Sequence, residues 1–198
     1  PHSDKCWAHG CEHLPFAAGA GRPTVIDMKN NLVRGVRKAS DFLMALQLTG
    51  AFKQDALSNL QVRLPAVVIG GGLTGVDTAT ELLAYYPLQV EKMLHRYEAL
   101  VGEIGDIAVR GAMDPEEQTI LDEFLLHGLA VRDERARAAA AGGAPDFNKL
   151  VRQWGGVTLA YRKRMQDSPA YRLNHEEVTK ALEEGITFAE NLDPVEAV

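Results

Sequence analysis

A glycine-rich turn between Ile69 and Val76 is the stretch of the sequence best suited to chemistry. Its glycines follow the pattern G-x-G-x-x-G. In that pattern the first glycine permits a tight turn, the second lets a pyrophosphate approach the backbone, and the third lets a helix pack close to a strand. Free amides at the start of that helix would donate to phosphate oxygens, and the helix dipole would favour the negative charge. We therefore predict a dinucleotide site made of Gly70, Gly71, Gly72, Leu73, Thr74 and Gly75.

Three basic residues form a second candidate part of this site. Arg162, Lys163 and Arg164 follow directly on the apolar run Gly156–Tyr161, and the next acidic residue is Asp167. Proteins that prefer NAD carry a carboxylate at the end of the second strand, and it would repel a 2′-phosphate. A guanidinium can instead bind a phosphate through two parallel hydrogen bonds. The sequence thus predicts NADP rather than NAD, with a solvated basic turn as the alternative.

Other candidate residues lie near the start of the chain. Cys6, His9, Cys11 and His13 are close enough together to suggest zinc, but their spacing does not match the usual ligand pairs. Ordinary packing is the favoured interpretation, and we predict no metal site. The histidines have no serine, cysteine or carboxylate partner at a catalytic spacing, so no catalytic residue is predicted.

The elements that must position the glycine-rich turn are a strand and a helix. Ala66–Ile69 is a short apolar run typical of a buried parallel strand, and Val76–Tyr85 contains no helix breaker. Pro87 is expected to break that helix or to restart it. The following Leu88–Val101 stretch has apolar residues at helical spacing where a second strand would be expected.

A helical insertion is therefore predicted from residue 87 to residue 154. Asp114, Pro115 and Glu117 have the pattern of a capping box with proline at the first helical position. Asp146 is expected to cap a further short helix that ends near Trp154.

The remaining pattern completes an α/β fold. A helix is expected at Gly35–Leu48 in the first part of the domain, residues 23–86. The continuation, residues 155–198, has the strand Gly156–Tyr161 and a helix capped by Asn174. Two further strands are expected, at Ile186–Ala189 and Pro194–Val198. This order predicts a Rossmann-like parallel sheet with the helical insertion after its first strand–helix unit.

Composition limits the classes of partner. The formal net charge of −6 and the lack of a basic face argue against nucleic acid, and no apolar stretch is long enough to cross a bilayer. With only two cysteines, no disulfide framework is expected, so we predict a cytoplasmic protein without a membrane partner. Both ends of the chain interrupt a pattern, which suggests a piece of a larger protein.

Several motifs together resemble one family, the pyridine nucleotide–disulfide oxidoreductases, and within it the small subunit of glutamate synthase. The matching stretches are AAGAGRP at 17–23, VVIGGGLTGVD at 67–77, GGVTLAYRKRMQDSPA at 155–170 and ALEEGITF at 181–188. Gly75 stands where alanine is usual and Ser168 where methionine is usual. The family pattern lacks the insertion, and no Cys-x4-Cys redox pair is present.

The resemblance implies the nicotinamide-binding part of a flavoprotein with two dinucleotide domains. Residues 1–22 would be the end of the FAD domain, whose own glycine-rich motif would lie outside this chain. In the intact protein NADPH would deliver a hydride to FAD, with the FAD domain of the same chain as a partner and an iron–sulfur domain or subunit as an open question. The isolated piece is expected to be inactive.

Two other classes of protein stay open. In one, the helical insertion binds a partner and the chain is an interaction or scaffold module with a vestigial nucleotide site. In the other, a methyltransferase, an acidic residue would be expected where Arg162 and Lys163 stand.

Overall fold

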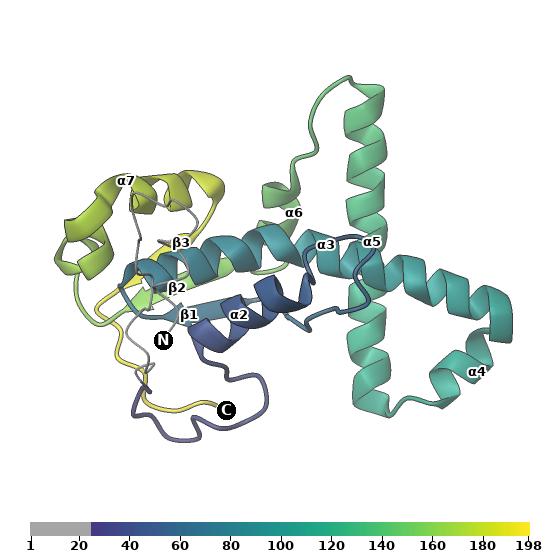
Figure 1. Ribbon diagram of the computed structural model, residues 1–198, viewed down its shortest axis with the longest axis horizontal. Helices are drawn as coiled ribbons and strands as arrows, with labels where there is room; N and C mark the ends of the chain where they lie inside the picture. The colour runs from purple at the N-terminus through teal and green to yellow at the C-terminus, as the bar shows by residue number, and fades with distance from the viewer. Residues whose placement is uncertain (1–24) are drawn as a thin grey trace, which may run out of the picture.

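The computed structural model describes residues 25–198, which form an α/β fold around a three-stranded parallel sheet (Figure 1). The strands β1 (Ala66–Ile69), β2 (Val157–Tyr161) and β3 (Thr187–Glu190) lie in the order β1-β2-β3. Val68 pairs with Leu159, and Leu159 pairs with Phe188. The predicted parallel sheet is confirmed, and each of these three strands lies within one residue of its expected bounds.

The helix α3 (Leu73–Ile104) is the longest element of the described chain, with 32 residues. It begins at Leu73, earlier than expected, and it continues through Pro87, so the predicted break at that residue is wrong. A proline in a helix forfeits one backbone hydrogen bond. Here Pro87 is buried between Tyr86 and Val90, both 0% exposed, and this packing outweighs the loss. The expected start of the insertion at residue 87 therefore lies inside a continuous helix.

The rest of the span from 87 to 154 is helical, as predicted. It contains α4 (Asp106–Gly111), α5 (Pro115–Ala140) and α6 (Phe147–Gln153) and no strand. The capping box is confirmed, because Glu117 N donates to Asp114 over 2.8 Å and Asp114 N donates to Glu117 over 3.0 Å. Asp146 likewise caps α6. Figure 1 shows α5 crossing α3 and extending beyond it on both sides.

Close backbone contact marks the place where α5 crosses α3. A β-carbon added to Gly128 of α5 would lie 2.7 Å from the Val90 carbonyl oxygen and 2.9 Å from the Leu94 β-carbon. Only glycine lets the two helix axes approach this closely.

An aromatic cluster beside the crossing joins α3 and α5 to the end of α6. The His127 ring stacks on Trp154 at 3.9 Å, and its Nδ1 lies 2.7 Å from the Tyr86 hydroxyl. Burial lowers the pKa of His127, opposed by the negative charge of Glu123. His127 thus packs between Trp154 and Tyr86.

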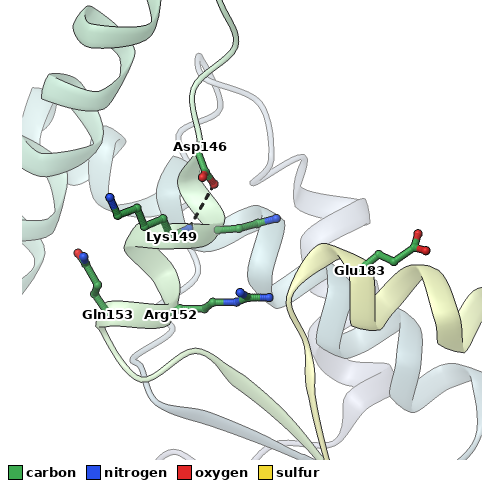
Figure 2. Close-up of a pocket in the computed structure, with 6 residues that line it drawn as sticks. Asp146, Lys149, Arg152, Gln153 and Glu183 are labelled. Atoms are coloured by element: carbon green, nitrogen blue, oxygen red, sulfur yellow. Dashed lines mark hydrogen bonds between the residues drawn. The ribbon is translucent and has the colours of Figure 1, made fainter.

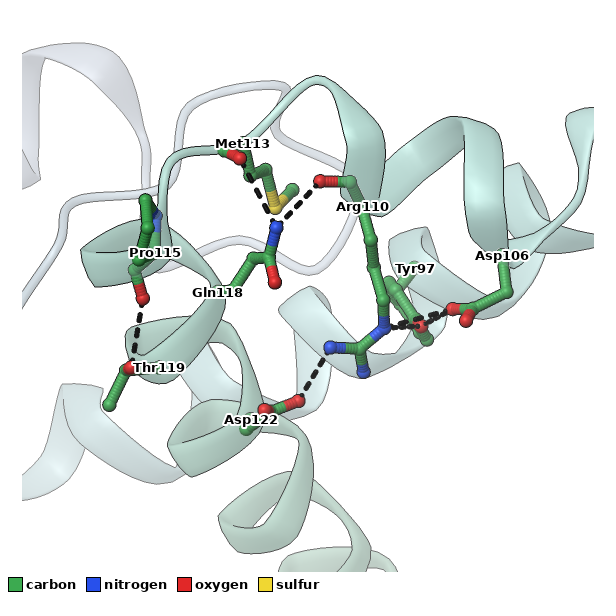
Figure 3. A network of polar contacts seen from close by, with 8 residues as sticks. All are labelled: Tyr97, Asp106, Arg110, Met113, Pro115, Gln118, Thr119 and Asp122. Atoms are coloured by element: carbon green, nitrogen blue, oxygen red, sulfur yellow. Dashed lines mark hydrogen bonds and ion pairs between the residues drawn. The ribbon is translucent and has the colours of Figure 1, made fainter.

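The short helix α4 is held to its neighbours by a polar network (Figure 3). Arg110 donates to Asp122 of α5 over 2.8 Å and to the Tyr97 hydroxyl of α3 over 3.0 Å. The Tyr97 hydroxyl donates to Asp106 and lowers the pKa of that carboxyl. These contacts tie the turn between α3 and α5 to both helices.

The helix α2 (Ala39–Thr49) packs on α3. It ends at Gly50, as predicted, but it begins at Ala39 rather than at Gly35. Phe42 lies edge-on to Tyr85 at 6.5 Å. The polar connector from α2 to β1 follows the surface of α3. The Lys92 ammonium of α3 donates to the carbonyls of Ala51, Lys53 and Ser58 over 2.9–3.0 Å.

The helix α7 (Pro169–Glu184) follows a short 3-10 turn, η1 (Met165–Asp167). It begins at Pro169 with Ser168 as its cap, so the predicted start at Asn174 is wrong for the element as a whole. Asn174 has φ −154° and ψ 79°, which divides α7 into two helical parts, and its side chain donates to Glu177 over 2.6 Å. Asn174 thus starts the second part.

The predicted strand at Pro194–Val198 does not join the described sheet. Asn191 has a φ of +57°, which turns the chain away after β3. Glu196 then makes an isolated parallel bridge with Lys29, and the two side chains form an ion pair of 2.7 Å.

One face of the sheet is covered by helices. Leu159 points toward α3, and Val178 and Ala181 of α7 are buried in the same core. Val67 points to the opposite face and is 61% exposed. Within residues 25–198, every helix is too short or too polar to span a lipid bilayer.

Candidate functional site

The glycine-rich turn lies at the carboxyl end of β1. Gly70 N donates to Ala160 O over 2.9 Å, which extends the pairing with β2 by one step. Gly70 then adopts a φ of +138°, a conformation that favours glycine, and the chain enters α3. The turn therefore lies at the edge where the parallel strands end, which is where α/β folds bind ligands.

The other glycines of the motif differ in what surrounds them. A β-carbon on Gly75 would lie 2.6 Å from the Gly70 carbonyl oxygen and 3.3 Å from Leu159, so this glycine allows the close packing of helix and strand that the motif predicts. A β-carbon on Gly72 would have no neighbour within 4 Å. Open space thus lies beside Gly72, where the motif predicts a phosphate.

The backbone amides at the start of α3 are available to a ligand. Gly72 is the N-cap, and no side chain caps the helix. Within residues 25–198, the N–H groups of residues 71–74 donate to no protein acceptor. The helix dipole adds positive potential at the same place.

The first turns of α5 and α7 differ from that of α3 in this respect. The capping box of Asp114 and Glu117 covers the start of α5. In α7, Tyr171 N donates to the Ser168 hydroxyl over 3.2 Å, and Ala170 N donates to Gly71 O over 2.9 Å. Those amides have partners, whereas the first amides of α3 have none within the described residues.

The predicted basic residues follow β2 and are all exposed. Arg164 donates to Asp167 over 2.9 Å and 3.3 Å, and it lowers the pKa of that carboxyl. Neither Arg162 nor Lys163 forms an ion pair with any residue in the described part of the chain. Of the three basic side chains, Arg164 alone forms an ion pair within the described residues.

The basic turn and the glycine-rich turn are in direct contact. Besides the hydrogen bond from Ala170 to Gly71, the Tyr161 ring packs against Gly71, where an added β-carbon would lie 2.7 Å from Cδ2. Sequence patterns did not identify Tyr161 or Ala170 as parts of the site. The serine–proline pair at 168–169, a cap followed by proline at the first helical position, was the available evidence that α7 begins beside the site.

A polar hollow lies elsewhere, between α6 and the end of α7. It has a volume of about 570 Å³ and is lined by polar side chains, Asp146, Asn148, Lys149, Arg152, Gln153 and Glu183. These residues precede β2 and β3, so the hollow lies at the amino ends of the strands, opposite the glycine-rich turn. Figure 2 shows Lys149 and Arg152 leaving α6 in opposite directions, so their charges do not converge on one ligand.

The structure offers no test of the zinc alternative. Cys6, His9, Cys11 and His13 lie outside the described residues, as do the first 22 residues expected to end the FAD domain. Among residues 25–198, no three or more histidine, cysteine, aspartate or glutamate side chains are grouped closely enough to hold a metal ion.

No protein-family model matches the sequence, and no solved structure matches it. The chain is similar to "Uncharacterized protein RP006" of Rickettsia prowazekii (strain Madrid E), with 40% identity over 184 residues. The match covers 93% of this chain and 24% of that protein, so the chain spans about a quarter of the relative's length.

Proposed function

We propose that this chain is the NADP(H)-binding part of an FAD-dependent oxidoreductase with a Rossmann-like nucleotide domain. The proposal rests on the resemblance to the pyridine nucleotide–disulfide oxidoreductases and on one structural observation. That observation is the uncapped start of α3, where the amides of residues 71–74 border the open space at Gly72. A pyrophosphate suits this place because it needs several donors and cannot approach past a β-carbon.

The second support for NADP is the charge beside the same edge of the sheet. Arg162 and Lys163 lie on the turn after β2, which contacts Gly71 through Tyr161 and Ala170. In nucleotide domains of this kind the ribose next to adenine lies at the end of the second strand. Arg162 and Lys163 are therefore the proposed ligands of the 2′-phosphate, and Arg164 makes a smaller contribution because Asp167 already pairs with it.

The role of the chain in the reaction is to bind and orient. Bound NADPH supplies the hydride, and a flavin held by another part of the intact protein would accept it. The amides of residues 71–74 hold the pyrophosphate, and the basic turn holds the adenosine end. No residue of the described chain is assigned a proton-transfer step, and the FAD domain and any iron–sulfur partner lie beyond these residues.

Gly72→Ala tests the pyrophosphate site. Gly72 has a φ of −90° and free space around it, so alanine is expected to leave the fold unchanged. The new methyl group occupies the place of the phosphate and should weaken NADPH binding at least tenfold, or about 1.4 kcal/mol. Titration of NADPH fluorescence measures the affinity, and urea unfolding measures stability.

Gly143→Ala is the matched control for this experiment. Gly143 is exposed, has no neighbour within 4 Å of an added β-carbon and lies on the turn after α5, away from the glycine-rich turn. Both variants should keep the parent stability within about 0.5 kcal/mol. Undiminished NADPH affinity in the Gly72 variant would contradict the proposed site.

Arg162→Ala tests the choice of nucleotide. The parent should bind NADPH more tightly than NADH, because a charge-assisted hydrogen bond contributes about 1.5–3 kcal/mol. Solvent screening reduces this, so we expect the ratio of the two affinities to fall about tenfold in the variant. Arg164→Ala should change the ratio less, since Asp167 already occupies that guanidinium. Equal parent affinities for the two nucleotides would rule out NADP as the preferred ligand.

One observation supports the alternative of an interaction module. The far end of the helical insertion exposes apolar side chains, with Leu100 48%, Ile104 59% and Ile107 90% exposed. Exposed apolar residues grouped in this way are common at protein interfaces. A parent chain that shows no saturable binding of NADPH at millimolar concentration would favour this function over nucleotide binding.

A further inference from the structure

Gly71 is the point at which the two halves of the proposed site are joined. Tyr161 is the last residue of β2 and directly precedes Arg162. A β-carbon on Gly71 would lie 2.7 Å from Cδ2 of Tyr161 and 2.8 Å from Cε2 and Cγ. The ring therefore rests against the backbone of the glycine-rich turn, and only glycine leaves room for it.

A second contact reaches the same glycine from the other end of the basic turn. Ala170, which is 1% exposed, donates its N–H to the Gly71 carbonyl over 2.9 Å. Residues 162–169 are thus bracketed by two contacts with one residue of the glycine-rich turn. Two more hydrogen bonds hold the basic turn against the end of β3. Met165 N donates to the Glu190 carboxylate over 2.7 Å, and Asn191 N donates to Lys163 O over 3.3 Å.

The distance between the glycine-rich turn and the basic turn matters because the pyrophosphate and the 2′-phosphate of NADP(H) are joined by covalent bonds. One phosphate must meet the amides of α3 while another meets Arg162, and binding groups have to be held within about 0.5 Å of the productive geometry. Arg162 is exposed and has no ion-pair partner among the described residues, so its own contacts do not hold it in place. Its position depends on the residue before it.

We propose that Tyr161 is a positioning residue that determines selectivity for a 2′-phosphorylated nucleotide. Its ring acts as a spacer between Gly71 and the start of the basic turn. This inference rests on the proposed function, and it assigns a role to the ring rather than to the hydroxyl, which makes no hydrogen bond within residues 25–198.

The test measures NADPH and NADH affinity of the full 198-residue chain and its Tyr161 variants by fluorescence titration. Tyr161→Phe keeps the ring and should preserve the parent ratio of affinities within twofold. Tyr161→Ala should lower NADPH affinity about tenfold and NADH affinity less than threefold, so that the ratio approaches one. Tyr161→Leu should lower the ratio of NADPH affinity to NADH affinity at least threefold. This variant keeps a large apolar side chain and replaces the alanine variant in the test if that variant does not fold. Tyr97→Ala removes a tyrosine in the insertion and should leave the ratio unchanged.

A suppressor experiment separates positioning from general damage. Gly71→Ala pushes a methyl group into the ring and should weaken the binding of both nucleotides at least tenfold. Adding Tyr161→Ala removes the obstacle, so the double variant should regain most of its NADH affinity without regaining the preference for NADPH.

The possible failures are distinguishable. A parent chain that binds neither nucleotide overturns the proposed function and this inference with it. A parent that prefers NADPH, together with a folded Tyr161→Ala variant that keeps the same preference, overturns the inference alone.

Discussion

Replacement of Lys92 by methionine is expected to lower the free energy of unfolding by about 3 kcal/mol. The Lys92 side chain lies on α3, is 2% exposed, and its ammonium donates to the carbonyls of Ala51, Lys53 and Ser58. Methionine keeps most of the apolar stem but removes all three donors. Each buried acceptor left without a partner costs about 1–3 kcal/mol, and water that enters beside the exposed connector recovers part of that.

The measurement is the urea unfolding midpoint together with the thermal midpoint, which should fall by about 6–12 °C for a chain of this size. Lys180→Met is the matched control, because Lys180 is exposed on α7, and it should stay within about 0.5 kcal/mol of the parent. A Lys92 variant as stable as the parent would show that the ammonium does not hold the connector.

Gly128→Ala is expected to destabilise the chain by about 2 kcal/mol. The added methyl group would lie 2.7 Å from the Val90 carbonyl oxygen and 2.9 Å from the Leu94 β-carbon, where neither backbone can yield without moving a helix. Overpacking of this kind costs about 1–3 kcal/mol, although alanine also raises helix propensity. The midpoints of urea unfolding and of thermal unfolding measure the effect of this variant too.

Gly102→Ala on α3 is expected to change stability in the opposite direction to Gly128→Ala. Gly102 is exposed, and an added β-carbon would meet nothing within 4 Å. This variant should therefore be more stable than the parent by about 0.5 kcal/mol, through propensity alone. A Gly128→Ala variant as stable as the parent, or more stable, would contradict the close crossing of α3 and α5.

Local sequence patterns predicted most of the elements, because their causes lie within a few residues. The apolar run at Ala66–Ile69 is β1, and the capping box at Asp114 is the start of α5. Predictions that relied on one local feature were less reliable. Pro87 is expected to break or restart a helix, but it is buried in the core and α3 continues through it.

The candidate site also has one part that local sequence patterns predict and another part that they do not. The glycine-rich turn was located from its motif, since the three glycines serve a backbone geometry that the motif encodes. The division among the basic residues was not predictable, because the pairing of Arg164 with Asp167 depends on the path of the turn η1. The contacts of Tyr161 and Ala170 with Gly71 join segments about 90 residues apart, and no local pattern marks such a contact.

The sequence by itself determined the three strands of the sheet, their parallel arrangement and the place of the glycine-rich turn at the end of β1. These follow from hydrophobic period, caps and glycine spacing, which act over short stretches. Only the tertiary structure decided that Pro87 stays helical and that Gly128 lies at a helix crossing. It also decided that Lys92 is buried and donates hydrogen bonds to the segment between α2 and β1. Each of these depends on what a residue meets across the fold, because burial and partners are properties of packed surfaces and not of neighbours in the chain.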